Sequence, residues 1–248
     1  INKGHEVVFT CRDKDVVIAL LANSKLRYFS FGKSYKSIIG KFFGLFYFTA
    51  RFFLIALKIK PDYYLNATLY SAIVAWIMGK PHISLEDTFN MEQVKLYSPF
   101  TNVILTGDYN HPSLGKKEIT YSGYQELLYL HPKYFSPNPD ILNELKINPG
   151  EKYVILRFVS WNASHDIGHK GINHKNKLFA IQELSKYAKV FISSESKLPL
   201  DFEKYRIQIQ PHQMHDVLFY ASLLWGESFT MPAECSALGT PSIINHNT

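Results

Sequence analysis

The stretch that decides the fold is Leu223–Ile244, LLWGESFTMPAECSALGTPSII. An apolar run ends at Gly226, a helical pattern runs from Thr230 to Leu238, and Pro241 opens a second apolar run. A strand, a helix and a second strand in this order form the repeating unit of parallel α/β sheets. The segment therefore predicts one strand–helix–strand unit of such a sheet.

The turn inside this unit has the chemistry of an anion site. Gly226 allows a sharp backbone turn. Ser228 and Thr230 can cap the helix, whose free N–H groups and positive dipole end attract a phosphate. Glu234 lies one helical turn further on, where its carboxylate can accept hydrogen bonds from two ribose hydroxyls. The alternative is an ordinary capped unit with no ligand.

The same alternation extends outward over most of the chain. We expect strands at 6–10, 26–31, 63–65, 81–85, 102–106, 153–159, 190–193, 207–209, 223–225 and 242–244. Helical patterns cover 13–23, 35–59, 69–78, 140–145, 175–187, 214–221 and 230–238. Short β-rich runs that alternate with helices indicate βαβ units on parallel sheets.

Residues 131–150, HPKYFSPNPDILNELKINPG, interrupt the alternation with four prolines. This composition is typical of a domain boundary. We therefore predict a Rossmann-like acceptor-side domain over 1–130, a linker over 131–150 and a second Rossmann-like domain over 151–248. Ligands of such folds bind at the carboxyl ends of the strands, so we expect a cleft between the two domains.

Composition excludes several classes of protein. Hydrophobic residues make up 46% of the 248 residues, which excludes a disordered or fibrous chain. Cys11 and Cys235 are far apart, which excludes a disulfide scaffold or a thiolate zinc site and favours a reducing, cytoplasmic compartment.

The positive charge is concentrated at one end. Residues 1–60 contain eleven Lys or Arg against three acidic residues, a net +8, whereas the whole chain carries +6. The helix expected over 35–59 is apolar but is interrupted by Lys41 and Arg51, so we do not expect it to span a membrane. Two interpretations remain: core packing, or a membrane-surface helix that uses the basic 33–60 segment and would suit a lipid-linked acceptor.

Further polar residues follow predicted strands. Arg157 lies in the 153–159 strand and can pair with a phosphate, and the loop after it contains Ser160 and His165, an acid or base near neutral pH. Glu86 and Asp87 follow the 81–85 strand and are candidates to contact or deprotonate an acceptor hydroxyl; capping of the next helix is the alternative for Asp87. A metal site at His165, Asp166 and His169 would need a helix, and glycines 168 and 171 favour a loop.

The 223–244 segment resembles the nucleotide-sugar motif of the GT-B superfamily, as carried by UDP-N-acetylglucosamine 2-epimerases and the peptidoglycan N-acetylglucosaminyltransferase. The resemblance implies that Ser228 and Thr230 hold a diphosphate and that Glu234 holds the ribose. Further blocks resemble an uncharacterised prokaryotic family grouped with GT-B proteins; they include Gly4-His5-Glu6-Val7, Ser164-His165-Asp166, Met214-His215-Asp216 and Leu238-Gly239-Thr240-Pro241.

These resemblances imply a GT-B-like fold of two Rossmann-type domains, truncated at both ends and lacking its first strand. They imply a glycosyltransferase-like enzyme that uses a nucleotide sugar, with UDP-sugar as the expected donor, and an unknown sugar or lipid-linked acceptor. We expect no metal, no separate cofactor and no nucleic-acid partner. Alternatives are a non-hydrolysing UDP-sugar 2-epimerase and a non-catalytic binding protein. The turn Glu227-Ser228-Phe229-Thr230 replaces the usual Asp-Ser-Gly-Gly of the epimerases, which narrows backbone approach to a diphosphate.

Overall fold

The computed structural model describes residues 3–33, 35, 37–159, 172–194, 197–227 and 229–245. The chain divides into two compact units, Ile1–Gln125 and Glu126–Thr248. The segment that the sequence predicts to be a linker belongs to the second unit, because Ile141 and Leu145 are buried in that unit's core.

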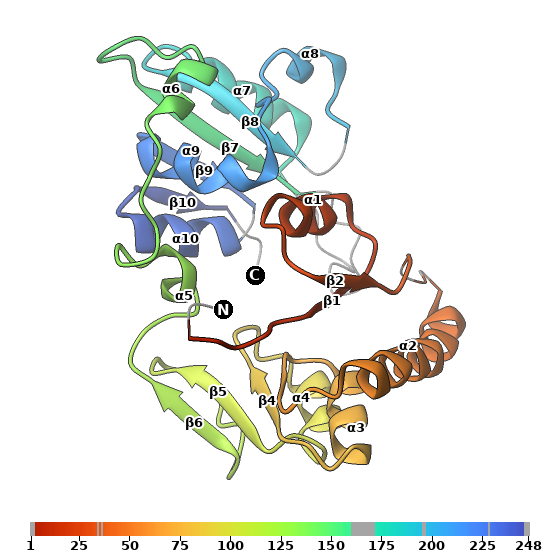
Figure 1. Ribbon diagram of the computed structural model, residues 1–248. Helices are drawn as coiled ribbons and strands as arrows, with labels where there is room; N and C mark the ends of the chain where they lie inside the picture. Colours follow the sequence, from red (N-terminus) through yellow and green to blue (C-terminus); the bar gives the residue numbers. More distant parts are fainter. Residues whose placement is uncertain are drawn as a thin grey trace. The chain divides into compact units, whose positions relative to one another are not determined.

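Unit 1 is a parallel α/β unit with two separate sheets (Figure 1). One sheet has the order β1-β2 and the other β3-β4-β5-β6, and every pairing is parallel. The strands are β1 (Phe9–Cys11), β2 (Tyr28–Ser30), β3 (Tyr64–Leu65), β4 (His82–Leu85), β5 (Val103–Gly107) and β6 (Glu118–Tyr121). The helices are α1 (Asp15–Asn23), α2 (Ile38–Ile59), α3 (Leu69–Ile77) and α4 (Met91–Tyr97).

The long helix α2 is set by clear local signals. The Ser37 side chain accepts a hydrogen bond from the Gly40 N–H and caps its start. Its end is at Lys60, which adopts a left-handed conformation immediately before Pro61. One face of α2 packs into the core of unit 1 through three buried side chains, Phe48, Phe52 and Ala56.

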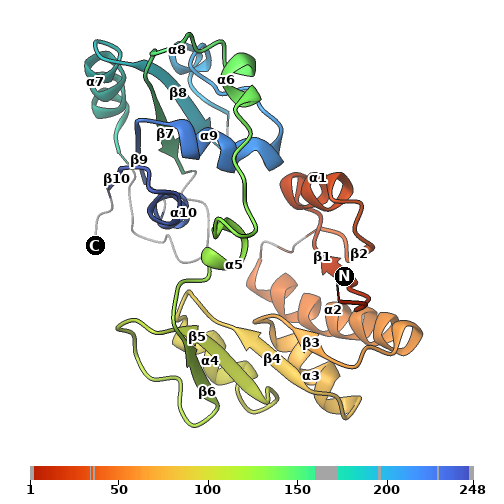
Figure 2. The same cartoon turned by 60° about the vertical axis from the view of Figure 1, so that its left-hand side comes forward.

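Unit 2 is built on one parallel sheet with the order β10-β9-β7-β8. Its strands are β7 (Tyr153–Phe158), β8 (Lys189–Ser194), β9 (Leu223–Gly226) and β10 (Ser242–Ile244). Its helices are α5 (Leu127–Leu130), α6 (Asp140–Glu144), α7 (His174–Leu184), α8 (Leu200–Glu203), the short 3-10 turn η1 (Pro211–Gln213), α9 (Met214–Tyr220) and α10 (Thr230–Leu238). The sheet and its helices are also visible from a second direction in Figure 2.

The central strand β7 explains why both faces of this sheet are covered. Tyr153 and Ile155 point into a core with residues of α6, α9 and α10, whereas Val154 and Leu156 point into a second core with residues of α7 and α8. Successive strand residues point to opposite faces, so a nearly continuous apolar strand needs helices on both sides.

One predicted strand is wrong. Residues 207–209 form no strand; the segment pairs with β8 only through the single bridge between Ile192 and Arg206. Its alternating apolar residues, Ile207 and Ile209, instead pack against the core on the α9 side. The chain then turns into η1 at Pro211, before further pairing can form.

Candidate functional site

The predicted binding residues of unit 2 lie around the carboxyl ends of β7 and β9. At this point Gly226 allows two strands to approach closely. A Cβ atom on Gly226 would lie 2.6 Å from the carbonyl oxygen of Arg157 and 2.7 Å from its Cβ. Gly226 does not have a positive φ, so the glycine is required for space and not for the backbone turn that the sequence predicted.

Glu227, directly after β9, joins two segments that are distant in sequence. Its buried carboxylate accepts hydrogen bonds from the Val159 N–H at 2.9 Å and from the Ile172 N–H. Lys177 of α7 completes the arrangement with an ion pair at 3.3 Å. Glu227 therefore fixes the point where β7 ends and the point where the chain enters α7. Sequence reasoning treated Glu227 only as part of the turn and did not predict this role.

Lys177 has a second contact that keeps its charge in place. Its ammonium group lies 4.4 Å from the centroid of the Phe158 ring, within the range of a cation–π interaction. Because the side chain of Glu227 is fully buried and that of Lys177 is only 16% exposed, removal of either partner would leave a charge in a poorly solvated position.

The start of α10 differs from the prediction in its capping. Phe229 is the N-cap residue and its side chain makes no cap hydrogen bond, and Thr230 is the first helical residue, not a cap. Pro232, at the third position, has no N–H. Thr230 and Met231 thus supply the free N–H groups of the first turn. The Phe229 ring is more than half exposed.

Glu234 lies on α10 beside side chains from two other helical segments. Its Oε1 atom is 3.1 Å from His215 Nε2 of α9 and 3.1 Å from the hydroxyl of Tyr129 of α5. The Tyr129 and His215 rings are themselves in contact, with centroids 5.4 Å apart. Among the described residues, none donates a hydrogen bond to the second carboxylate oxygen, Oε2. The cluster of Tyr129, His215 and Glu234 therefore holds a carboxylate in place by one oxygen.

The partners of Glu234 were not predicted from the sequence. His215 was part of a family-like block, and Tyr129 was assigned to the first domain. The available signal was weak: a histidine near the start of α9 and a glutamate on the next helix, α10.

Arg157, near the end of β7, is partly buried, and its Nη1 atom donates a hydrogen bond to Ser193 Oγ of β8 at 3.0 Å. This contact places the guanidinium at the carboxyl edge of the sheet. The predicted residues Ser160, His165 and Ser228 lie outside the described residues, as does the possible metal group around His165. Among the described residues, no group of three or more His, Cys, Asp or Glu could hold a metal ion.

In unit 1, Glu86 follows β4 as predicted, but its carboxylate is engaged in the fold. It is buried, and its Oε1 accepts hydrogen bonds from the Thr88 N–H, the Thr88 hydroxyl and the Phe89 N–H. Its Oε2 accepts a hydrogen bond from the Tyr97 hydroxyl at 2.6 Å. Burial, followed by this bond, raises the pKa of Tyr97 well above its ordinary value. Asp87, by contrast, is exposed.

Solved structures match nearly the whole chain. The UDP-GlcNAc 2-epimerase of Neisseria meningitidis bound to UDP-GlcNAc matches with a TM-score of 0.63 and 14% identity, over 97% of this chain and 83% of that one. The UDP-N-acetylglucosamine 2-epimerase of Rickettsia bellii gives 0.56 and 16%, over 96% and 78%. The spinosyn forosaminyltransferase gives 0.55 and 13%, over 99% and 74%.

The fold is of the GT-B type. The matches support the predicted fold, with its parallel α/β sheets. No protein-family model and no curated protein sequence matches the chain, so membership of the uncharacterised family stays a prediction. At these identities the likeness concerns the fold alone, and function has to be argued from the side chains.

Proposed function

We propose that unit 2 binds a nucleotide-activated sugar, a UDP-sugar in the first instance, with Glu234 as the ligand of the ribose. The observation that carries this proposal is the arrangement of Glu234, His215 and Tyr129. A ribose presents two neighbouring hydroxyl donors, and a carboxylate with one oxygen anchored and the other available can accept from them. The GT-B-type fold and the UDP-GlcNAc complexes of similar structures support the same ligand class.

We propose that the diphosphate lies at the start of α10. The N–H groups of Thr230 and Met231 and the positive end of the helix dipole would face it, and Arg157 would supply a full positive charge. Ser228 and Ser160 remain proposed contacts. Pro232 limits the number of backbone donors, so the arginine carries more of the stabilisation than in a glycine-rich turn.

The reaction that we propose is glycosyl transfer. An acceptor hydroxyl would form a bond to the anomeric carbon while the bond to the diphosphate oxygen breaks, and a base would take the hydroxyl proton. His165 and Asp87 are the proposed bases, and the acceptor is a sugar or a lipid-linked sugar at a cytoplasmic location. Glu86 remains a weaker candidate, because a role as base would compete with the four hydrogen bonds that it accepts.

A second candidate reaction is non-hydrolysing epimerisation at sugar carbon 2. It is favoured by the similar structures whose names are those of UDP-GlcNAc 2-epimerases. It uses the same nucleotide site and needs no acceptor. Deuterium incorporation at carbon 2 from heavy water, without acceptor, would assign this reaction; binding without either reaction would assign a non-catalytic role.

The binding proposal is tested by calorimetry on the whole chain with UDP, UDP-GlcNAc, GDP and CMP. We expect the uridine nucleotides to bind, and Glu234→Ala to weaken them by about tenfold or more, because a charged hydrogen bond is lost. Glu183→Ala, which removes an exposed glutamate from α7, is the matched control and should bind as the wild type does. Absence of binding by all four nucleotides would refute the proposal.

A further inference from the structure

Helix α2 has an exposed apolar face that the core of unit 1 does not use. At about 100° per residue, the buried side chains Phe48, Phe52 and Ala56 occupy one side of the helix. The other side carries six large apolar residues that are 42–66% exposed: Phe42, Phe43, Phe46, Tyr47, Leu54 and Leu57. We call these six residues the α2 face. Isolated exposed apolar residues are ordinary, but a continuous patch of this kind marks an interaction surface.

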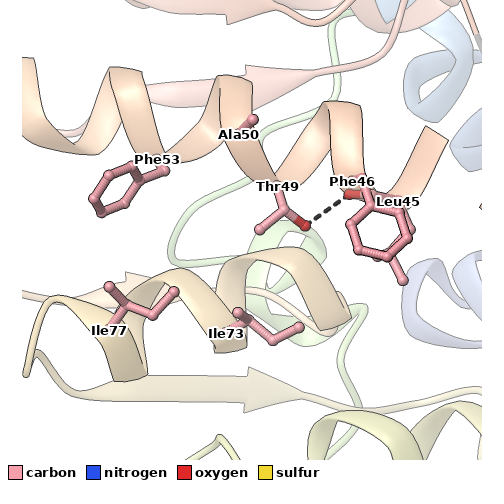
Figure 3. Close-up of a pocket in the computed structure, with 7 residues that line it drawn as sticks. All are labelled: Leu45, Phe46, Thr49, Ala50, Phe53, Ile73 and Ile77. Atoms are coloured by element: carbon pink, nitrogen blue, oxygen red, sulfur yellow. Dashed lines mark hydrogen bonds between the residues drawn. The ribbon is translucent and has the colours of Figure 1, made fainter. Parts of the chain in front are cut away.

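A groove extends this surface toward α3. It has a volume of about 500 Å³ and lies between the two helices, as the close-up in Figure 3 shows. Its lining is apolar except for one hydroxyl, and that hydroxyl, on Thr49, donates to the Leu45 carbonyl of its own helix. The groove therefore presents almost no polar group to a ligand. Acyl chains suit such a lining better than a polar molecule does.

The charged residues of α2 itself are all basic: Lys41, Arg51 and Lys58. Residues 16–61 contain eight basic residues and no Asp or Glu. Arg51 and Lys58 are exposed and are rotated by about 160–180° from Phe42 around the helix axis. They therefore lie at the border of the α2 face that Tyr47 forms. Arg51 also donates a hydrogen bond to the Tyr47 hydroxyl at 2.9 Å, which places a guanidinium at the border of the apolar surface. This is the pattern of an amphipathic helix that lies on anionic lipids.

We infer that the α2 face docks unit 1 onto an anionic lipid membrane, with the helix lying in the plane of the interface. The window Phe42–Ile59 has a mean hydropathy of 1.7 and is long enough to cross a bilayer. Its buried side, however, is covered by protein, including Phe31 and Val74, so lipid cannot surround it. The phenylalanines would enter the acyl region while Arg51 and Lys58 meet the headgroups.

A second copy of the chain fits this surface less well than a membrane does. Two α2 faces packed against each other would bring their basic borders together, and residues 16–61 offer no carboxylate to neutralise them. Like charges placed together in an interface oppose association. Anionic headgroups provide the missing negative charge.

The test is co-sedimentation of the whole chain with vesicles, without nucleotide, so that its outcome is independent of the proposed enzymatic function. Vesicles of phosphatidylcholine alone are compared with vesicles that also contain phosphatidylglycerol. We expect binding to the anionic vesicles that weakens as salt is added. Equal binding to both vesicles, or no binding to the anionic ones, would overturn the inference.

Three variants locate the contact. The double variant Phe42→Ser with Phe46→Ser should lower partitioning of the protein onto the vesicles by about tenfold or more, because two rings that would enter the acyl region are lost. Arg51→Gln with Lys58→Gln should lower it by about fivefold for each charge. Phe179→Ser with Leu200→Ser removes two exposed apolar residues of unit 2 and should bind as the wild type does.

All these side chains are exposed, so the thermal midpoint of each variant should match that of the wild type and provides the folding control. Unchanged binding by the phenylalanine variant would overturn the inference. A dimer that forms without vesicles and is lost in the phenylalanine variant would assign the α2 face to a second copy instead.

Discussion

The two units place buried polar groups differently. In unit 1, Glu86 accepts hydrogen bonds from residues that are no more than eleven positions away, and the buried His82 contacts Ser71 and Thr101 on neighbouring elements. In unit 2, Glu227 joins segments that are 50 or more positions away and pairs with a lysine. The comparison teaches that a glutamate after a parallel strand can shape one loop or connect a whole edge of the sheet.

The largest effect should follow removal of the distant connection. Glu227→Ala should destabilise unit 2 by about 3–5 kcal/mol, because Lys177 and two backbone N–H groups lose their buried partner. Hydrogen exchange of the amides in β7 and β9 measures the effect within unit 2. Glu203→Ala, at an exposed ion pair of the same unit, is the control and should change stability by about 0–1 kcal/mol. Equal protection in both variants would contradict the assigned role of Glu227.

Unit 1 should lose stability in acid because of His82. Burial lowers the pKa of His82 to about 4, below its unfolded value of about 6.5, so the unfolded chain binds the proton more tightly. Stability is therefore fully present above about pH 6.5 and falls by up to about 3 kcal/mol as the pH drops toward 4.

Hydrogen exchange of the β4 and β5 amides across this pH range checks the prediction for His82. We expect a His82→Asn variant to have a flatter pH dependence, because it lacks the titrating imidazole. If the wild type and the variant show the same slope, His82 is not the titrating group.

The smallest effect distinguishes a structural from a catalytic Glu86. In Glu86→Gln the amide oxygen can still accept the bonds from Thr88 and Phe89, and the Tyr97 hydroxyl can reverse its direction, so we expect a loss of about 1 kcal/mol. Turnover of a nucleotide sugar should persist in Glu86→Gln. Turnover of the Asp87→Asn variant, which changes the neighbouring proposed base, is measured for comparison. Complete loss of turnover in a folded Glu86→Gln protein would make Glu86 the base.

Much of the fold follows from the sequence, because it depends on local patterns. The alternation of β-rich runs with helices predicted parallel sheets, and Gly239, with a φ of 82°, ends α10 where the pattern placed its end. The strand expected at 207–209 was wrong because alternating apolar residues show only which side chains face a core. Ile207 and Ile209 are partly buried against the core, but only the Ile207 N–H bonds to β8.

The candidate site was less predictable, because it depends on contacts between distant residues. The sequence indicated Glu234 through its place on the helix after Gly226. It could not indicate that His215 and Tyr129 meet the same carboxylate oxygen, since no pattern connects residue 129 with residue 234. Glu86 was a catalytic candidate because it follows a strand of a parallel sheet. The same position brings its carboxylate close to the backbone N–H groups of Thr88 and Phe89, and these contacts make it structural.

The central claim, that Glu234 binds a ribose, is tested most directly by calorimetry with UDP and 2′-deoxy-UDP on the wild type and on Glu234→Ala. We predict that the wild type prefers UDP by about tenfold, since a hydrogen bond to a charged group is lost with the hydroxyl, and that the variant binds the two nucleotides equally. A variant that keeps the wild-type preference, or a wild type that shows none, would contradict the claim.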